Sequence, residues 1–283
     1  MSLTGLKRNT IDKFYTKDAA VDLCLEMVKT HLSISNDDLI IEPSAGNGSF
    51  INKLKTLSNY YIFYDLQPEH VDIIKQDFLE LPLNLTDTEI KTKFHTITKF
   101  EKIHVIGNPP FGRQSSLAIK FIKKSCEFCD SVSFILPKSF KKDSLKRVFP
   151  PQFHLIFEMD LPEKSFLVNG LEHNVDTIFQ IWEKKDSCRE IVEKLEPVNF
   201  VFTAQTENPD ISFRRVGVYA GKIDKNPNKD KSIQSHYFIK FTNNKSVDEN
   251  IELLKKVNFD HNNTTGPKSI SKQELISQFN PLL

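Results

Sequence analysis

Glycine is scarce in this sequence. The chain of 283 residues contains nine glycines, about 3%, where roughly 7% is usual. Four of the nine (Gly46, Gly48, Gly107 and Gly112) lie in two short segments. Glycine is needed where a backbone turns tightly or approaches a ligand closely. The two segments are therefore the first candidates for functional loops.

Long apolar runs and paired cysteines are also missing. No window approaches the ~18 uninterrupted apolar residues of a membrane span, and MSLTGLKRNTIDKFYTKD at the N-terminus lacks the apolar core of a signal peptide. We therefore expect a soluble, intracellular protein, cytoplasmic or nuclear, with no membrane partner. Of the four cysteines only Cys126 and Cys129 form a CxxC pair, without a second pair or paired histidines. This pattern predicts reduced thiols and no metal site.

Neither positive nor negative residues are in excess over the whole chain. Lys and Arg number 38 against 37 Asp and Glu, a net charge of +1, which excludes a uniformly basic surface. From Arg113 to Arg147, however, nine basic residues face three acids. This stretch predicts contacts to the phosphates of a nucleic acid, with Arg113, Lys138, Lys141 and Lys142 as candidates. The alternative is a solvated helix face.

The order of elements predicts an open α/β domain. Apolar runs predict strands at 39–42, 60–65, 103–107 and 131–137, and spacing predicts helices at 18–32, 69–75, 115–129 and 138–149. Two runs without a helix between them, 153–161 and 175–183, predict an antiparallel hairpin. Strands at 198–202 and 236–241, a loop at 222–232 and a helix at 247–257 follow. We expect an N-terminal helical or cofactor-lid segment (1–35), a catalytic domain (36–185) and a small C-terminal module (186–283) for substrate recognition.

The first glycine segment is EPSAGNGSF, Glu42 to Phe50, between a predicted strand and a predicted helix. In open α/β sheets ligands bind beyond the carboxyl ends of strands. Gly46 and Gly48 would let the backbone lie against a ligand, with amides pointing outward from the helix start. The segment is neither a GxGxxG fingerprint nor a phosphate loop, which disfavours dinucleotide or ATP binding.

Two acids follow at positions suited to a nucleoside. Asp65 ends the strand 60–65, 19 residues after Gly46. A carboxylate about 20 residues after such a turn can accept both ribose hydroxyls. Asp77 lies in the next turn. Taken singly, Asp65 could be a turn residue and Asp77 a helix cap, but their order after the glycine turn favours binding.

The second glycine segment contains Asn108, Pro109, Pro110 and Phe111, directly after the strand 103–107. Consecutive prolines fix the backbone and remove two amide donors, so the loop is stiff and rich in acceptors. The Asn108 amide oxygen and the Pro109 carbonyl are suited to accept both hydrogens of one planar NH2 group. Phe111 offers a ring face on which a planar base could stack.

Together these motifs resemble a known family. EPSAGNGSF, Asp65, QDF at 76–78 and NPPF at 108–111 are similar, in order and spacing, to S-adenosylmethionine-dependent methyltransferases of exocyclic amines, above all the adenine-N6 enzymes. KFYTK, FILPKSF and FLVNGLEHNVDTIFQIW resemble further elements, so the likeness spans about residues 13–183. It implies a Rossmann-like class I methyltransferase fold: a mixed, mostly parallel seven-stranded sheet with a closing antiparallel hairpin. It also implies S-adenosyl-L-methionine as cofactor.

The resemblance assigns roles to residues of this chain. Asn108, Pro109, Pro110 and Phe111 would be catalytic, with Asn108 and Pro109 gripping the amine, Phe111 stacking on a flipped base, and Phe166 forming the opposite wall. Thr16 would lie near the cofactor carboxylate. The implied cofactor contacts are Phe14, Tyr15, Thr16, Glu42, Pro43, Ser44, Ala45, Gly46, Gly48, Asp65, Leu66, Asp77, Phe78 and Asn108.

Four functions remain open on this evidence. The first, which we slightly favour, is adenine-N6 methylation of DNA. The second is the same chemistry on RNA, where NPPF followed by a glycine such as Gly112 also occurs. The third is methylation of a glutamine amide in protein, which the basic stretch argues against. The fourth is a catalytically silent nucleic-acid-binding partner, which the intact Asn108, Gly46 and Gly48 argue against. The sequence does not specify an oligomeric state.

Overall fold

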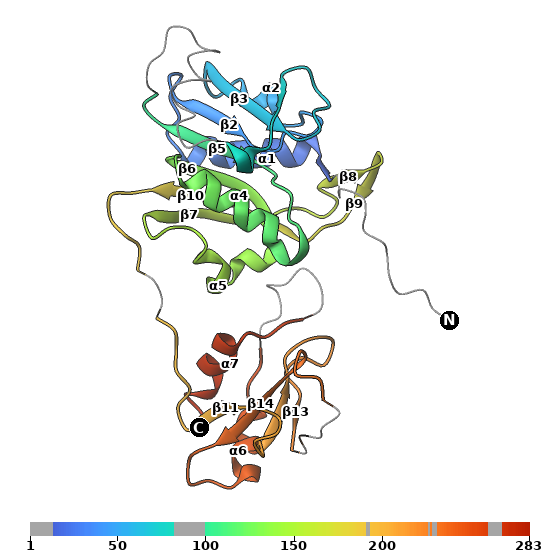
Figure 1. Cartoon of the computed structure of the whole chain (residues 1–283), viewed down its shortest axis with the longest axis vertical. Coiled ribbons are helices and arrows are strands. Elements are labelled where there is room, and N and C mark those ends of the chain that lie inside the picture. The colour runs from blue at the N-terminus through green and yellow to red at the C-terminus, as the bar shows by residue number, and fades with distance from the viewer. Residues whose placement is uncertain (1–13, 82–99, 191–192, 226, 228–230, 260–267) are drawn as a thin grey trace. The chain divides into compact units, whose positions relative to one another are not determined.

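A computed structural model of the chain describes residues 14–81, 100–190, 193–225, 227, 231–259 and 268–283. The chain divides into two compact units, Met1–Ile191 (unit 1) and Val192–Leu283 (unit 2), shown in Figure 1. Part of the predicted N-terminal segment, before Phe14, lies outside the described residues. Among the described residues, no helix has both the length and the apolar character needed to cross a membrane.

Unit 1 is built on a seven-stranded sheet with the order β4-β3-β2-β5-β6-β10-β7. The strands are β2 (Leu39–Glu42), β3 (Tyr60–Asp65), β4 (Ile73–Lys75), β5 (Ile103–Gly107), β6 (Ser131–Pro137), β7 (Phe153–Asp160) and β10 (Thr177–Lys184). The first five strands in the sheet order are parallel, and β10 runs antiparallel to both β6 and β7. This confirms the predicted mixed, mostly parallel seven-stranded sheet with its closing antiparallel pair.

Helices cover both faces of this sheet. They are α1 (Asp18–His31), α2 (Ile51–Leu54), α4 (Ser116–Cys126) and α5 (Asp143–Lys146). Leu39 and Ile41 of β2 join a core cluster with α4, whereas Ile40 joins a second cluster with α1 and α2. Successive side chains of a strand point to opposite faces, so a sheet buried on both sides needs the continuous apolar runs seen in the sequence.

A small antiparallel sheet joins the start of the described chain to the segment between the two closing strands β7 and β10. Its strands are β1 (Tyr15–Thr16), β8 (Phe166–Val168) and β9 (Leu171–His173). Thr16 pairs with Phe166, so the start of the described chain is held against the connection from β7 to β10. The predicted hairpin is therefore correct in its pairing, but a second, smaller hairpin forms its connection.

The structure corrects three local predictions in unit 1. The helix expected at 69–75 is wrong, because Ile73 of β4 pairs with Phe63 of β3 as an edge strand. The helix expected at 138–149 is broken into η3 (Lys138–Lys141) and α5 by the extended backbone of Lys142. The helix expected at 115–129 ends three residues early, at Cys126.

Unit 2 is a four-stranded antiparallel sheet with its own core. Its strands in the order β11-β14-β12-β13 are β11 (Phe200–Thr203), β14 (His236–Phe241), β12 (Ile211–Arg214) and β13 (Ile223–Asp224), with helices α6 (Val247–Leu254) and α7 (Lys272–Phe279). The predicted strands at 198–202 and 236–241 and the helix at 247–257 are confirmed within a few residues. β12 and α7 were not predicted. The predicted loop at 222–232 contains β13, and residues 226 and 228–230 lie outside the described residues.

Candidate functional site

The candidate site lies where β2 and β5 end. These neighbouring parallel strands form the switch point of the sheet, because the chain continues from β2 to one side and from β5 to the other. Ligands of open α/β sheets bind at such points, beyond the carboxyl ends of the strands. Glu42 ends β2 and Asn108 follows β5, so both predicted motifs reach this carboxyl edge of the sheet.

The glycine turn after β2 has a conformation that requires glycine. Gly46 and Gly48 have φ values of +53° and +87°, in the left-handed region. A Cβ on Gly48 would lie 2.9 Å from Cδ1 of Ile51. The Gly46 amide donates a hydrogen bond of 2.8 Å to Oδ2 of Asp65, across the 19 residues noted in the sequence. The turn is thus tied directly to the acid that ends β3.

The two predicted acids lie close together. Asp65 also accepts a bond of 2.7 Å from the Gln67 amide, and its carbonyl accepts one of 3.0 Å from the Gln76 amide. That second bond brings Asp77 next to the end of β3. Asp77 accepts from the Leu79 amide at 2.9 Å and so caps the short helix η1 (Phe78–Glu80). The capping role that the sequence left open for Asp77 is present.

The Asn108 side chain is oriented by its neighbours. Its Nδ2 donates to Oγ1 of Thr16 at 3.2 Å and to the Phe14 carbonyl at 3.5 Å. Its backbone carbonyl accepts from Oγ of Ser44 at 3.2 Å. Since the amide nitrogen donates to Thr16 and Phe14, the amide oxygen Oδ1 is the atom left for a ligand.

Two buried oxygens at this edge have no hydrogen-bond partner. Five side-chain atoms in the described part of the chain are buried and unpartnered, and Oδ1 of Asn108 and Oε2 of Glu42 are two of them. Glu42 is 2% exposed. Burial, and secondarily the nearby Asp65 carboxylate, raise the pKa of Glu42 well above its ordinary value. An unmade buried hydrogen bond costs about 1–3 kcal/mol, so two such atoms mark a place where a ligand with donors would fit.

The segment before α1 covers the glycine turn. The Tyr15 hydroxyl donates to the Glu69 carboxylate at 2.8 Å, and the Tyr15 ring lies 3.6 Å from where a Cβ of Gly46 would be. The Glu69 amide in turn donates to the Gly46 carbonyl at 3.1 Å. Glu69 was missed from the sequence, because its role depends on a contact 54 residues away along the chain. Phe14 packs edge-on against Phe166, with ring centroids 6.4 Å apart.

The loop after NPPF has an unusual backbone. Gly112, Gln114 and Ser115 have φ values of +69°, +53° and +62°. For the two residues with side chains this conformation costs about 1–3 kcal/mol each, and such strain concentrates at functional sites. Phe111, one residue earlier, packs partly against both core clusters of unit 1.

The other predicted site residues differ in how far their side chains are exposed. Phe78 is 1% exposed and stacks on Phe121 with ring centroids 5.5 Å apart, so its side chain is a core residue. Its contact to the adenine stays a prediction. Phe166 is also 1% exposed, within the second core cluster. Leu66 is 57% exposed beside Asp65. Pro43, Ala45 and Pro109 are buried along the backbone of the two loops, and Pro110 is exposed.

Three of the lysines after the loop pair with acids that the sequence count left out. Lys138 and Lys141 both pair with Asp160, at 3.6 and 2.7 Å, and Lys146 pairs with Glu158 at 3.2 Å. Both acids belong to β7, outside the stretch from 113 to 147. Their positions weaken the prediction that Lys138 and Lys141 bind phosphate. Arg113 is exposed in the described structure.

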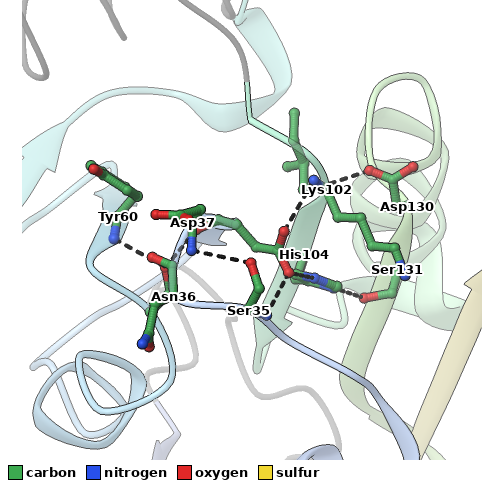
Figure 2. Close-up of polar contacts among 11 residues, drawn as sticks. Ser35, Asn36, Asp37, Tyr60, Lys102, His104, Asp130 and Ser131 are labelled. Atoms are coloured by element: carbon green, nitrogen blue, oxygen red, sulfur yellow. Dashed lines mark hydrogen bonds and ion pairs between the residues drawn. The ribbon is translucent and has the colours of Figure 1, made fainter. Parts of the chain in front are cut away.

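The opposite, amino edge of the same strands carries a buried polar network (Figure 2). His104 of β5 lies between Ser131 of β6, with Nδ1 2.7 Å from Oγ, and Asp38, with Nε2 3.2 Å from Oδ2. Asp38 also accepts from the backbone amides of Ser35 and Lys102. His104 and Asp38 are each 2% exposed and Ser131 1%. An Asp-His-Ser row buried so completely cannot meet a substrate, so this network fixes the pairing of β2, β5 and β6.

This chain is only distantly similar to proteins of known structure. No protein-family model and no curated protein matches the sequence. A proposed RNA methyltransferase from Pyrococcus horikoshii is 16% identical over 65% of this chain and 93% of its own, with a TM-score of 0.45. A dimethyladenosine transferase from Plasmodium falciparum is 14% identical over 62% of this chain and 64% of its own, with a TM-score of 0.38. The 23S rRNA methyltransferase ErmE is 13% identical over 63% and 72%, with a TM-score of 0.42. Identities and TM-scores this low do not establish what this chain binds or modifies.

Proposed function

We propose that this chain is an S-adenosylmethionine-dependent methyltransferase acting on the exocyclic N6 amine of adenine in nucleic acid. One observation carries the proposal: Oδ1 of Asn108 is buried and unpartnered at the carboxyl end of β5, while its Nδ2 is fixed by Thr16. A fixed acceptor in that position suits a ligand that brings an NH2 group. The two prolines that follow have no backbone N–H, so they add carbonyl acceptors to the loop and no donor.

The residues of the adjacent turn fit the cofactor. Gly46 and Gly48 leave a backbone surface without Cβ atoms, Asp65 lies beside that turn, and Glu42 offers a buried carboxylate oxygen without a partner. Gly46, Gly48 and Glu42 would hold the methionine part, and Asp65 the ribose hydroxyls. When bound, S-adenosylmethionine supplies an electrophilic methyl group on a sulfonium centre.

The chain's own contribution to the reaction is to hold and polarise the amine. The N6 lone pair of adenine is delocalised into the ring, so the planar amine is a poor nucleophile. Oδ1 of Asn108 and the carbonyl of Pro109 would accept its two hydrogens and favour a pyramidal nitrogen, most strongly in the transition state. Phe111 would hold the base plane, and positioning supplies much of the remaining rate. The role needs no side chain that attacks the methyl group.

The proposal is tested by following the methyl group into defined substrates. Radiolabelled cofactor is incubated with single- and double-stranded DNA, with RNA and with protein, and the nucleic acids are digested to nucleosides for chromatography. We expect label in N6-methyladenosine or its deoxy form. Matched oligonucleotides in which hypoxanthine replaces adenine, and so lack the amine, should take up no label.

The same assay separates the alternatives. Label in protein glutamine, or in cytosine of nucleic acid, would contradict the assignment to adenine. Equal labelling of adenine- and hypoxanthine-containing strands would contradict the role of the amine. The ratio of labelling between DNA and RNA decides which polymer is the substrate.

A further inference from the structure

Unit 2 brings two cations and two aromatic rings together from four segments. Phe202 of β11 and Tyr237 of β14 meet edge to face with centroids 5.5 Å apart. Nζ of Lys272, at the start of α7, lies 4.4 Å from the Phe202 ring centroid and 6.0 Å from that of Tyr237. Cζ of Arg215, just after β12, lies 4.9 Å from the Tyr237 centroid. We name these four residues the cation–aromatic cluster.

Neither cation of the cluster forms an ion pair with a described carboxylate. No carboxylate among the described residues lies within ion-pair distance of Arg215 or Lys272, and Nε of Arg215 is buried without a hydrogen-bond partner. The nearest acid in the sequence, Glu274, accepts from the Ser271 amide at 2.7 Å and acts electrostatically on Tyr237, but it forms no ion pair with either cation. A buried N–H without an acceptor, next to a second unpaired cation, favours an anionic ligand.

Other lysines of unit 2 differ from this pair. Lys225 and Lys255 pair with Asp248 and Glu252, each at 2.6 Å. The loop that leaves Arg215 carries Tyr219, which is 73% exposed. An exposed ring on the same loop as this arginine suits a polymer with both phosphates and base faces.

We infer that the cation–aromatic cluster of unit 2 binds the phosphate backbone of single-stranded nucleic acid, with Tyr219 stacking on an unpaired base. The inference rests on the proposed function for the nature of the substrate. It gives unit 2 a role in anchoring the substrate, for which Lys138 and Lys141 are less suited because both pair with Asp160. Stacking on unpaired bases is tolerant of sequence, so the cluster would supply affinity and not sequence choice.

The test is binding of fluorescent single-stranded RNA and DNA oligonucleotides to the full chain, measured by anisotropy across a salt series. We expect the double variant Arg215→Gln, Lys272→Gln to bind at least about tenfold more weakly, with the salt slope reduced by roughly 0.7 per lost phosphate contact. Tyr219→Ala should weaken single-strand binding about fivefold or more without changing the slope. Because Tyr219 is exposed, this second variant does not depend on the packing of the unit.

The matched control is Lys225→Gln, Lys255→Gln, which removes the same charge from lysines that are already paired. It should bind within about twofold of the wild-type protein. Equal affinity and slope for the cluster variant and the wild-type protein would overturn the inference, as would a preference for duplex over single strands that survives both variants. If the wild-type protein binds through the cluster but methylates no adenine, the proposed function fails and the inference stands.

Discussion

The two edges of one sheet differ in how their buried polar atoms are satisfied. At the carboxyl edge, Oε2 of Glu42 and Oδ1 of Asn108 are buried without partners. At the amino edge of the same strands, Asp38 and His104 are equally buried but fully hydrogen-bonded. Since an unmade buried bond costs about 1–3 kcal/mol, the amino edge stabilises the fold, and the carboxyl edge gives up stability where a ligand would bind.

The largest effect is expected at the carboxyl edge, on the methyl-transfer rate of a variant at Asn108. Asn108→Ala should lower the methyl-transfer rate by about 10²- to 10³-fold, as loss of one aligned transition-state contact does. The free energy of unfolding should change by no more than about 1 kcal/mol, because only two long hydrogen bonds from Nδ2 are lost. Radiolabel transfer and urea unfolding measure the two quantities. Transfer above a tenth of the wild-type rate would remove Asn108 from the mechanism.

The reverse effect is expected at the amino edge. Asp38→Ala leaves the His104 ring N–H and the Lys102 amide without an acceptor. We expect the free energy of unfolding to fall by about 2–4 kcal/mol, while transfer per folded molecule stays within about twofold. The control is Asp37→Ala, an exposed neighbour of the same type, which should change stability by less than about 0.5 kcal/mol. Similar losses for both variants would contradict a special role of the network.

Glu42 should make both the stability of the protein and its cofactor affinity depend on pH. Burial, and secondarily Asp65, raise its pKa above the ordinary 4.5, so the folded state holds this proton more tightly than the unfolded state. Stability therefore falls as pH rises above that ordinary value, and Glu42→Gln should remove this loss, giving an apoprotein at least as stable at about pH 8. Cofactor affinity, measured by calorimetry, should rise with pH in the wild-type protein. In the variant it should be about tenfold weaker and independent of pH. A pH-independent wild-type affinity would contradict the contact.

A variant at Thr16 tests the role of the segment before α1. Its Oγ1 accepts from Nδ2 of Asn108, so Thr16→Val should leave the amide less firmly oriented. We expect kcat to fall about tenfold, with cofactor affinity changed by less than about threefold, and Thr16→Ser to restore kcat. If cofactor affinity falls and kcat does not, Thr16 contacts the cofactor carboxylate, as the resemblance implies, and does not position Asn108.

The smallest expected effect is the pH dependence of the amino edge. Burial lowers the pKa of His104 despite the nearby Asp38 carboxylate, so the unfolded state binds the proton more readily. The network's contribution is present above about pH 6.5 and is lost as pH falls through the lowered pKa. Urea unfolding between about pH 7.5 and pH 5 should show this loss, and His104→Gln should flatten it. An exposed control, His173→Gln, should keep the wild-type profile.

The sheet was predictable where the sequence signal was continuous. Four buried strands of unit 1 appear as apolar runs that end in an acid, a glycine or a proline, because a strand buried on both faces needs apolar side chains throughout. The edge strand β4 was not predictable, since three residues carry no periodicity and its pairing with β3 decides its structure. The same holds for η3 and α5, where basic residues with helical spacing are divided by an extended Lys142.

The site was predictable as a set of loops but not as a geometry. The glycine turn, Asp65 and the NPPF loop each carry a local signal, and the bond from the Gly46 amide to Asp65 joins two of them. Nothing in the sequence indicates that Glu69 holds Tyr15, or that Asp160 pairs with two lysines of the basic stretch. The burial of Phe78 was not predictable either, because the motif next to Asp77 does not show that this side chain lies in the core.

By itself the sequence determined which strands are buried, where glycine is obligatory, and where a rigid acceptor loop follows a strand. These properties depend on neighbouring residues and on the period of apolar side chains. Only the tertiary structure decided which polar atoms are left unpartnered and which charges are neutralised. The reason is physical: a hydrogen bond or ion pair depends on distances of a few ångströms between residues far apart in the chain, and no local pattern fixes those distances. The two loops that hold four of the scarce glycines are also where the structure leaves Oε2 of Glu42 and Oδ1 of Asn108 without partners.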